Sequence, residues 1–410
     1  MLDRLIYDIL KKNKILKDLV KFCYQSIFSI LGRRKARLVT NLDVKEISHS
    51  FFGFHDRPSM NSINELLSHK MLEDGTFSGV IQILNIETSV VVWETSTECF
   101  SKQQASLATW VDDSTVIFND FNGKPMTFIQ NIVTGKKRKL DFHFYSISPG
   151  GRYLTSINFL RFGRGLEGYG YDVTYDSDFL ADAKNYISSN AISDFIIYDL
   201  QNNLELTRFS MKDLLGKSSG LDINGYFYFS HSDFSPSSRY CYFLLRSSNR
   251  KFNSSQLFVY DLHLDNLIAL DTDGMVSHLS WMSDDSLVAY CKPRGKNDGY
   301  YIFHISNLDV IPLINSNLLF DGHPHAYNEN GFYTDTYPNR ERRQKVFYVD
   351  LENNNVENLL ELYSPIKFRG VNRVDLHPRL SKCKRFLTID SSHNNHHSQL
   401  VLSVEKIHLQ

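Results

Sequence analysis

The chain has 410 residues, of which 42% are hydrophobic, 13% aromatic and 22% charged. This is an ordinary globular composition, and the 29 Phe and 22 Tyr favour a β-rich protein. A formal net charge of -1 gives no reason to expect a nucleic acid as the partner. The five cysteines are scattered and form no Cys-x-x-Cys pair, which argues against a zinc knuckle and favours a reducing, cytoplasmic location.

Residues 1–40 are predicted to form a basic, amphipathic helical segment apart from the main domain. Apolar residues recur at helical spacing between Leu5 and Leu31, but lysines interrupt them before any run reaches transmembrane length. The segment ends in the basic run Arg33–Arg37. Such a helix lies on an anionic membrane surface or packs against the side of a domain. We therefore predict membrane-surface association through residues 1–37, peripheral to the inner membrane, with packing on the domain as the alternative.

A weak repeat runs through residues 41–410. Its first half is a turn rich in Ser, Pro, Asp, Asn or Gly followed by a short apolar strand, as in Ser148–Leu154 and Ser235–Phe243. Its second half is a strand closed by a polar turn, as in Phe195–Leu200 and Leu257–Leu262. About seven copies recur at roughly the 40–50-residue length of a propeller blade. The sequence therefore predicts one all-β domain, a seven-bladed β-propeller, rather than a β-sandwich.

The repeat is interrupted between residues 153 and 195, where the interval is too long for one blade. This insertion contains Arg161, Tyr169 and Tyr171 among several glycines. Such a composition suits a loop shaped over a ligand, although a surface excursion would look the same.

Histidines recur at matching positions of successive units. A single histidine before a blade turn is most often structural, but histidines at the same position of several blades point at a common axis. Together with aspartates they suit a divalent metal such as Mn²⁺ or Zn²⁺, or a proton relay. These histidines are His55, His143, His231, His278, His323 and His377.

Other chemistries find less support. The chain has no phosphate-binding loop, no dinucleotide-binding glycine pattern and no Gly-x-Ser-x-Gly nucleophile elbow. A hydrolase or glycosyltransferase using Asp56, Asp233 or Asp335 is a weaker hypothesis, because it requires two carboxylates at a separation that the sequence does not define.

Two segments resemble motifs of the oligogalacturonate lyase family, Ser277–Trp281 and His377–Ser381. A wider set of segments is similar to propeller proteins encoded in bacterial capsule and O-antigen gene clusters, and this likeness covers most of the chain after about residue 45. The segments are Phe52–Pro58, Gln103–Gln104, Gly168–Tyr171, Asp321–Pro324, Thr334–Pro338 and Asp375–Arg379. The resemblance implies a seven-bladed propeller with a histidine-bound Mn²⁺.

The same resemblance implies a metal site made of His278, Asp375 and His377. The family pattern Gln-x-x-His-x-His reads Asn372-Arg-Val-Asp-Leu-His377 here, so Asn372 stands for the glutamine and Asp375 for the first histidine. Aspartate is a competent ligand for Mn²⁺, so Mn²⁺ is the favoured cofactor, although a site that lost its metal and kept only glycan binding is equally compatible.

The resulting hypothesis is a polysaccharide lyase that cleaves a uronate-containing bacterial glycan by β-elimination. The alternative is a non-catalytic propeller that binds a bacterial polysaccharide or oligosaccharide, or organises its biosynthesis. In the lyase hypothesis, His231 or His323 is the base, Tyr337 the acid, and Arg373 and Arg379 pair with the substrate carboxylate. The remaining predicted substrate contacts are His55, Arg57, Arg161, Tyr169 and Tyr171.

Overall fold

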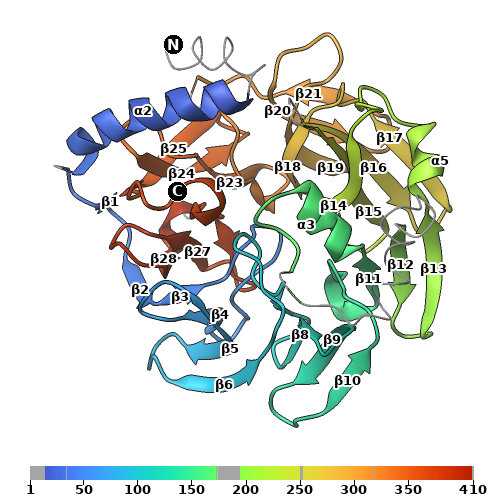
Figure 1. The fold of residues 1–410 in the computed structure, drawn as a ribbon, viewed down its shortest axis with the longest axis horizontal. Helices are drawn as coiled ribbons and strands as arrows, with labels where there is room; N and C mark the ends of the chain where they lie inside the picture. The colour runs from blue at the N-terminus through green and yellow to red at the C-terminus, as the bar shows by residue number, and fades with distance from the viewer. Residues whose placement is uncertain are drawn as a thin grey trace.

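The computed structural model describes residues 14–33, 35–171, 173, 194–249, 253–316 and 318–408. In this part of the chain, seven antiparallel sheets are arranged as a ring about a central axis (Figure 1). This confirms the seven-bladed propeller and excludes the sandwich.

Each sheet begins with an inner strand near the axis and continues outward along the chain. The first three sheets contain β3 (Ser50–Phe51), β4 (Glu65–Met71), β5 (Phe77–Asn85) and β6 (Val91–Ser96); β7 (Thr109–Trp110), β8 (Thr115–Phe121), β9 (Pro125–Asn131) and β10 (Lys137–Leu140); and β11 (Tyr153–Ser156), β12 (Phe195–Asp199) and β13 (Leu204–Phe209). The fourth and fifth sheets contain β14 (Tyr226–Phe234), β15 (Tyr240–Ser248), β16 (Asn253–Asp261) and β17 (Asn266–Leu270); and β18 (Val276–Trp281), β19 (Ser286–Cys291), β20 (Gly299–His304) and β21 (Val310–Pro312).

The last two sheets also contain strands from the beginning of the chain. The sixth has β22 (His325–Asn328), β23 (Gly331–Asp335), β24 (Arg343–Asp350), β25 (Asn355–Tyr363) and, outermost, β1 (Leu38–Thr40). The seventh has β26 (Arg379–Leu380), β27 (Phe386–Ser391), β28 (Ser398–Ser403) and β2 (Val44–Ser48). Because β2 pairs with β28, the two ends of the domain close the ring. Residues 38–40, which were predicted to belong to the helical segment, are therefore part of the propeller.

The core lies between adjacent sheets, where apolar side chains from facing strands interleave. Phe195 of β12 and Phe243 of β15 stack with ring centroids 4.1 Å apart, which joins the third and fourth sheets. Each such fully buried aromatic or aliphatic side chain contributes about 1.5–3 kcal/mol. Because a sheet alone would leave one face wet, these contacts require all seven repeats to be in place.

The two faces of the ring differ in what they carry. Consecutive strands are antiparallel, so the connections into the inner strands and the turns between second and third strands share one face. We call this the connection face. The turns that follow the inner strands lie on the opposite face. Every inner strand thus starts at the connection face and crosses the ring.

Helices occur at the edges of this framework. Helix α2 (Lys14–Arg33) lies across the sixth sheet (Figure 1), while residues 1–13, which belong to the predicted helical segment, are outside the described residues. The insertion forms the short helix α3 (Phe159–Gly165), and α5 (Met211–Leu215) follows β13. Within the described ranges, no helix combines the length and apolar character needed to cross a membrane.

Candidate metal centre

Histidines in or next to the inner strands of five sheets converge around the ring of Phe54. The Phe54 centroid lies 4.5 Å from that of His55, 4.7 Å from that of His231 and 5.4 Å from that of His377. His278 and His323 follow at 6.2 and 6.5 Å. The convergence expected from the repeat is therefore present. His143 is the exception, because its Nε2 is bonded to the Asp120 carbonyl and its ring packs on Phe159 and Tyr171.

Local backbone irregularities aim these side chains into the channel. His231 is the extra residue of a bulge between Ser230 and Ser232, and its φ is 46°. The register of β18 also shifts around His278, and His377 has a φ of 48°. Bulges and left-handed non-glycine residues interrupt regular pairing and redirect a side chain, at a cost that is common at functional sites.

Three of the residues form a group that could hold a cation. His323, Asp375 and His377 each offer a ligand atom, and these atoms all lie within 4.8 Å of one another. All three side chains are buried, yet Asp375 Oδ1 and both ring nitrogens of His377 have no hydrogen-bond partner among the described residues. Leaving several buried polar atoms without partners is costly, and a divalent cation would satisfy them. The nitrogen and oxygen donors fit Mn²⁺.

This grouping differs from the predicted ligand set at one position. His278 stands beside the group, with its ring centroid 4.1 Å from that of His323, and its Nδ1 lies 3.2 Å from Asp321 Oδ1. His323, predicted as a base, takes its place as a candidate ligand. Asn372 points away, because its side chain is exposed and accepts a hydrogen bond from Lys102.

Asp335 supports the group from behind. His323 Nδ1 donates to the carboxylate of Asp335, at 2.8 and 3.0 Å from its two oxygens, and this leaves Nε2 for the cluster. The backbone amides of His323 and His377 donate to the same carboxylate. Burial alone would raise the pKa of Asp335, but His323 and these hydrogen bonds lower it, so the carboxylate stays ionised. A carboxylate that orients a histidine in this way is a common feature of metal sites.

His231 also contacts the Phe54 ring and has a ring nitrogen without a partner among the described residues. Its Nδ1 is buried and without a hydrogen-bond partner within the described ranges. Burial and the positive charge of Arg246 hold the pKa of His231 well below its usual value, so the ring is neutral near pH 7. Arg246 donates to Ser230 Oγ of β14 and to the Ser277 carbonyl of β18. These hydrogen bonds hold Arg246 between the strands that carry His231 and His278.

Tyr337 and Arg373 form the half-buried outer layer of the site. The Tyr337 hydroxyl lies 3.5 Å from His323 Nε2, and burial raises the pKa of Tyr337 well above its usual value. Arg373 donates through Nε to Asp375 Oδ2 at 2.6 Å and through Nη2 to the Tyr169 hydroxyl at 3.3 Å. These predicted residues are therefore together at the mouth of the site.

Other predicted substrate contacts hold the channel together instead. His55 Nδ1 donates to the Pro324 carbonyl, and Arg57 binds both carboxylate oxygens of Asp56 at 2.7 Å. Arg379 has an exposed fraction of 0% and donates to Asp390 at 2.9 Å. A substrate could reach these side chains only by displacing their internal partners, so the structure corrects their predicted role.

The insertion likewise turns inward. Arg161 Nε donates to the Phe227 carbonyl, and the Tyr171 hydroxyl donates to the Ser106 carbonyl. A Cβ on Gly170 (φ +69°) would lie 2.7 Å from Gly163, which explains why this segment is rich in glycine. Three residues of the insertion were predicted to contact the sugar. Of these, Tyr169 lies next to the histidines that converge on Phe54, with its ring 6.1 Å from that of His231.

The carboxylates of the hydrolase hypothesis also have partners inside the protein. Asp335 accepts a hydrogen bond from His323, and Asp56 accepts one from Arg57. Burial and the nearby Asp56 raise the pKa of Asp233 well above its usual value. This set does not present an exposed acid–base pair.

Sequence reasoning missed Phe54 and Arg246 as members of the site. Phe54 lies inside the segment Phe52–Pro58 that carries the family resemblance, but a role was predicted only for its neighbours His55, Asp56 and Arg57. Arg246 directly follows the apolar strand run Tyr240–Leu245, and a charge at that point was the available signal.

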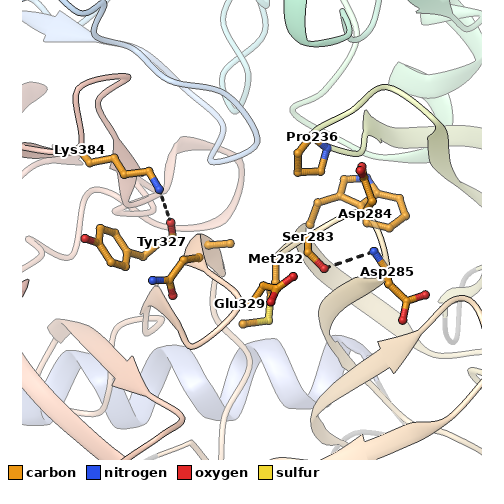
Figure 2. Close-up of a pocket in the computed structure, with 11 residues that line it drawn as sticks. Pro236, Met282, Ser283, Asp284, Asp285, Tyr327, Glu329 and Lys384 are labelled. Carbon is orange, nitrogen blue, oxygen red and sulfur yellow. Dashed lines mark hydrogen bonds between the residues drawn. The ribbon is translucent and has the colours of Figure 1, made fainter.

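A separate hollow opens on the opposite face of the ring (Figure 2). It encloses about 660 Å³ and is formed by the turns that follow the inner strands. Lys384 Nζ donates to the Tyr327 carbonyl across it. None of the predicted site residues lines this hollow. Its lining residues are Pro236, Trp281, Met282, Ser283, Asp284, Asp285, Ala326, Tyr327, Asn328, Glu329 and Lys384.

Comparison with known proteins supports the fold. No protein-family model and no curated protein sequence matches the chain. An oligogalacturonate lyase in complex with manganese superposes with a TM-score of 0.60 at 10% identity, covering 92% of this chain and 100% of that one. The oligogalacturonate lyase of Vibrio parahaemolyticus gives 0.58 at 10% identity, with coverages of 91% and 99%. The chain is thus similar to these lyases in fold.

Proposed function

We propose that the protein is a metal-dependent polysaccharide lyase that cleaves a uronate-containing glycan by β-elimination. The observation that supports this most is the buried group of His323, Asp375 and His377, in which Asp375 and His377 have ligand atoms unpartnered among the described residues. His231, whose ring contacts the same Phe54, is neutral and has an Nδ1 that is likewise unpartnered there. The manganese found with a structurally similar lyase fits the same donor set.

The reaction removes a proton from C5 of a uronic acid and breaks the bond between C4 and the glycosidic oxygen. His231 Nδ1 accepts the C5 proton, the electron pair of the C5–H bond forms the C4=C5 double bond, and the glycosidic oxygen leaves. Tyr337, kept protonated by its raised pKa, donates a proton to that oxygen. When bound, a divalent cation neutralises the uronate carboxylate and so makes the C5 proton more acidic.

Neighbouring side chains set the protonation state and the orientation of the residues proposed to act in this reaction. Burial, together with the charge of Arg246, lowers the pKa of His231 and keeps the ring in its neutral form. Arg373 positions Asp375, and its side chain, 28% exposed, is available to the substrate carboxylate. Asp335 holds His323 in one tautomer. We further propose that the substrate is a bacterial capsule or O-antigen glycan, from the sequence resemblance alone.

Absorbance near 235 nm, the band of the unsaturated uronate product, tests this proposal against a panel of uronate-containing bacterial polysaccharides. We expect a Mn²⁺-dependent rise that EDTA abolishes. His231→Ala should reduce the rate by about 10²–10⁴-fold, the usual contribution of a general base. His304→Ala, a half-buried histidine on the outer part of the fifth sheet, is the matched control and should retain the rate.

A rise that is equal with and without Mn²⁺, or unchanged in His231→Ala, would contradict the proposal. If no polysaccharide gives a rise but one binds, the protein is a glycan-binding propeller. The departure of Asn372 from the lyase pattern favours that second function, because its side chain does not reach the metal group.

A further inference from the structure

Helix α2 is inverted relative to an ordinary surface helix. The residues buried against the propeller are polar or small, namely Gln25 (5% exposed), Ser29 (3% exposed) and Gly32. The outward stripe is apolar: Leu19, Ile27 and Ile30 are 57, 66 and 56% exposed. Together with exposed Cys23, they lie along one side of the helix at intervals of three or four residues. We call Leu19, Cys23, Ile27 and Ile30 the outer stripe.

The inner contacts keep the helix in this orientation. Gln25 Nε2 donates to the carbonyls of Pro338 and Asn339 at 2.9 and 3.0 Å, and Arg342 Nη1 donates to Gln25 Oε1. Gly32 packs so closely that an added Cβ would clash with the carbonyl of Glu341. Turning the outer stripe toward the propeller would break these hydrogen bonds, so the stripe remains on the surface.

Charge is distributed unevenly between this segment and the rest of the chain. Residues 1–37 contain ten Lys and Arg against three Asp, a net charge of +7, whereas the remaining residues carry -8. Each basic residue near an anionic lipid surface adds about 1 kcal/mol of attraction. The basic segment is therefore complementary to anionic lipid, and the acidic remainder is not.

The helix also lies on the same face as the candidate metal centre. It contacts the turn between β23 and β24, which contains Tyr337, and its Phe22 ring lies 3.8 Å from the guanidinium carbon of Arg369. Arg369 precedes Arg373 in the connection into β26. Both contacts belong to the connection face of the ring, where the histidines also enter.

We propose that the outer stripe inserts into the headgroup region of an anionic lipid bilayer and holds the connection face of the propeller toward that surface. An exposed apolar stripe flanked by basic residues is typical of interfacial helices. The orientation brings the mouth of the candidate metal centre to the side from which a membrane-bound glycan would be presented. The lipid contact does not depend on the lyase reaction.

Flotation of the full chain with phosphatidylcholine vesicles, with and without phosphatidylglycerol, tests the proposal. We expect at least about tenfold tighter binding to the vesicles that contain phosphatidylglycerol, and a loss of at least about tenfold in the variant Leu19→Ser/Ile27→Ser/Ile30→Ser. The matched control, Val133→Ser/Ile223→Ser/Ile314→Ser, removes three apolar side chains elsewhere that are even more exposed, at 79, 78 and 83%, and should bind like the parent chain.

Equal vesicle binding by the stripe variant and the control would overturn the proposal. Absence of binding, combined with a dimer in sedimentation that the stripe variant abolishes, would assign the stripe to a second copy of the chain and also overturn it. Thermal unfolding checks that both variants are folded, and lyase activity does not enter the readout, so the two proposals fail separately.

Discussion

Two arginine–aspartate pairs, whose arginines lie close together in the sequence, differ in their solvent exposure and in their roles. Arg373 bonds Asp375 at 2.6 Å where the connection enters the seventh sheet, and Arg379 bonds Asp390 at 2.9 Å inside the channel. The Arg373 side chain is 28% exposed and that of Arg379 is 0% exposed. Both arginines were predicted to bind a substrate carboxylate, and only the first is placed where it could.

The difference lies in how completely the carboxylates are satisfied. Asp390 also accepts hydrogen bonds from the backbone amides of Phe52 and Gly53, so it ties the first and seventh sheets together. Asp375 keeps one oxygen without a partner, beside the unpaired ring of His377. Since a buried unsatisfied polar group costs about 1–3 kcal/mol, the open oxygen of Asp375 favours a ligand at the mouth, whereas both oxygens of Asp390 already have partners within the protein.

Breaking the channel pair should have the largest effect. Asp390→Ala leaves the Arg379 guanidinium buried without its partner, which costs about 3–5 kcal/mol. Urea unfolding should show this loss, and added Mn²⁺ should not restore it. A loss below 1 kcal/mol would show that the pair is not the structural bond that we describe.

The buried side chain of His69, which also has all its hydrogen-bond partners, should make the free energy of unfolding depend on pH. His69 is fully buried, with Nδ1 bonded to the Phe51 carbonyl and Nε2 to Ser106 Oγ. Burial lowers its pKa from 6.5 to about 4, so only the unfolded chain takes up this proton between those values. This contribution to stability is complete above pH 6.5 and falls by about 3 kcal/mol as pH drops toward 4.

Comparison of the parent chain with His69→Gln checks the histidine prediction. Unfolding free energies measured from pH 7 to pH 4.5 should fall less steeply in the variant, by about one proton. Parallel curves for the two proteins would contradict a depressed pKa at His69.

At the mouth, weakening the support of a candidate ligand should change metal affinity more than stability. Asp335→Asn removes the charge behind His323 and should lower Mn²⁺ affinity by about 10–100-fold in calorimetric titration. Asp233→Asn is the matched control, because Asp233 is outside the metal group and accepts a hydrogen bond from the Phe234 amide. Equal Mn²⁺ affinities in the two variants would show that Asp335 does not support metal binding.

The smallest effect is expected for the mouth arginine. Arg373→Ala should reduce stability by only about 1 kcal/mol, since water can reach the vacated space beside Asp375. Added Mn²⁺ should reverse this loss, in contrast to Asp390→Ala, because a cation satisfies the same carboxylate. A loss in thermal unfolding that Mn²⁺ leaves unchanged would make the two pairs equivalent.

Much of this molecule follows from its local sequence pattern. Turn residues followed by apolar strands, as in Ser235–Phe243, recur often enough to require a ring of sheets, because one blade cannot cover its own faces. The same repetition places histidines such as His231 and His323 near one axis. The sequence therefore determined the fold and the approximate location of the site.

The tertiary structure decided the roles of individual residues. Arg379 and Tyr171 look like surface contacts in sequence, but partners far away along the chain, the carbonyls of Gly53 and Ser106, bond them in the interior. His323 joins Asp375 and His377 because Asp335, on a neighbouring strand, turns its ring. Periodicity predicts which face of a strand a residue occupies, whereas hydrogen-bond partners and solvent exposure depend on segments brought together only when the ring closes.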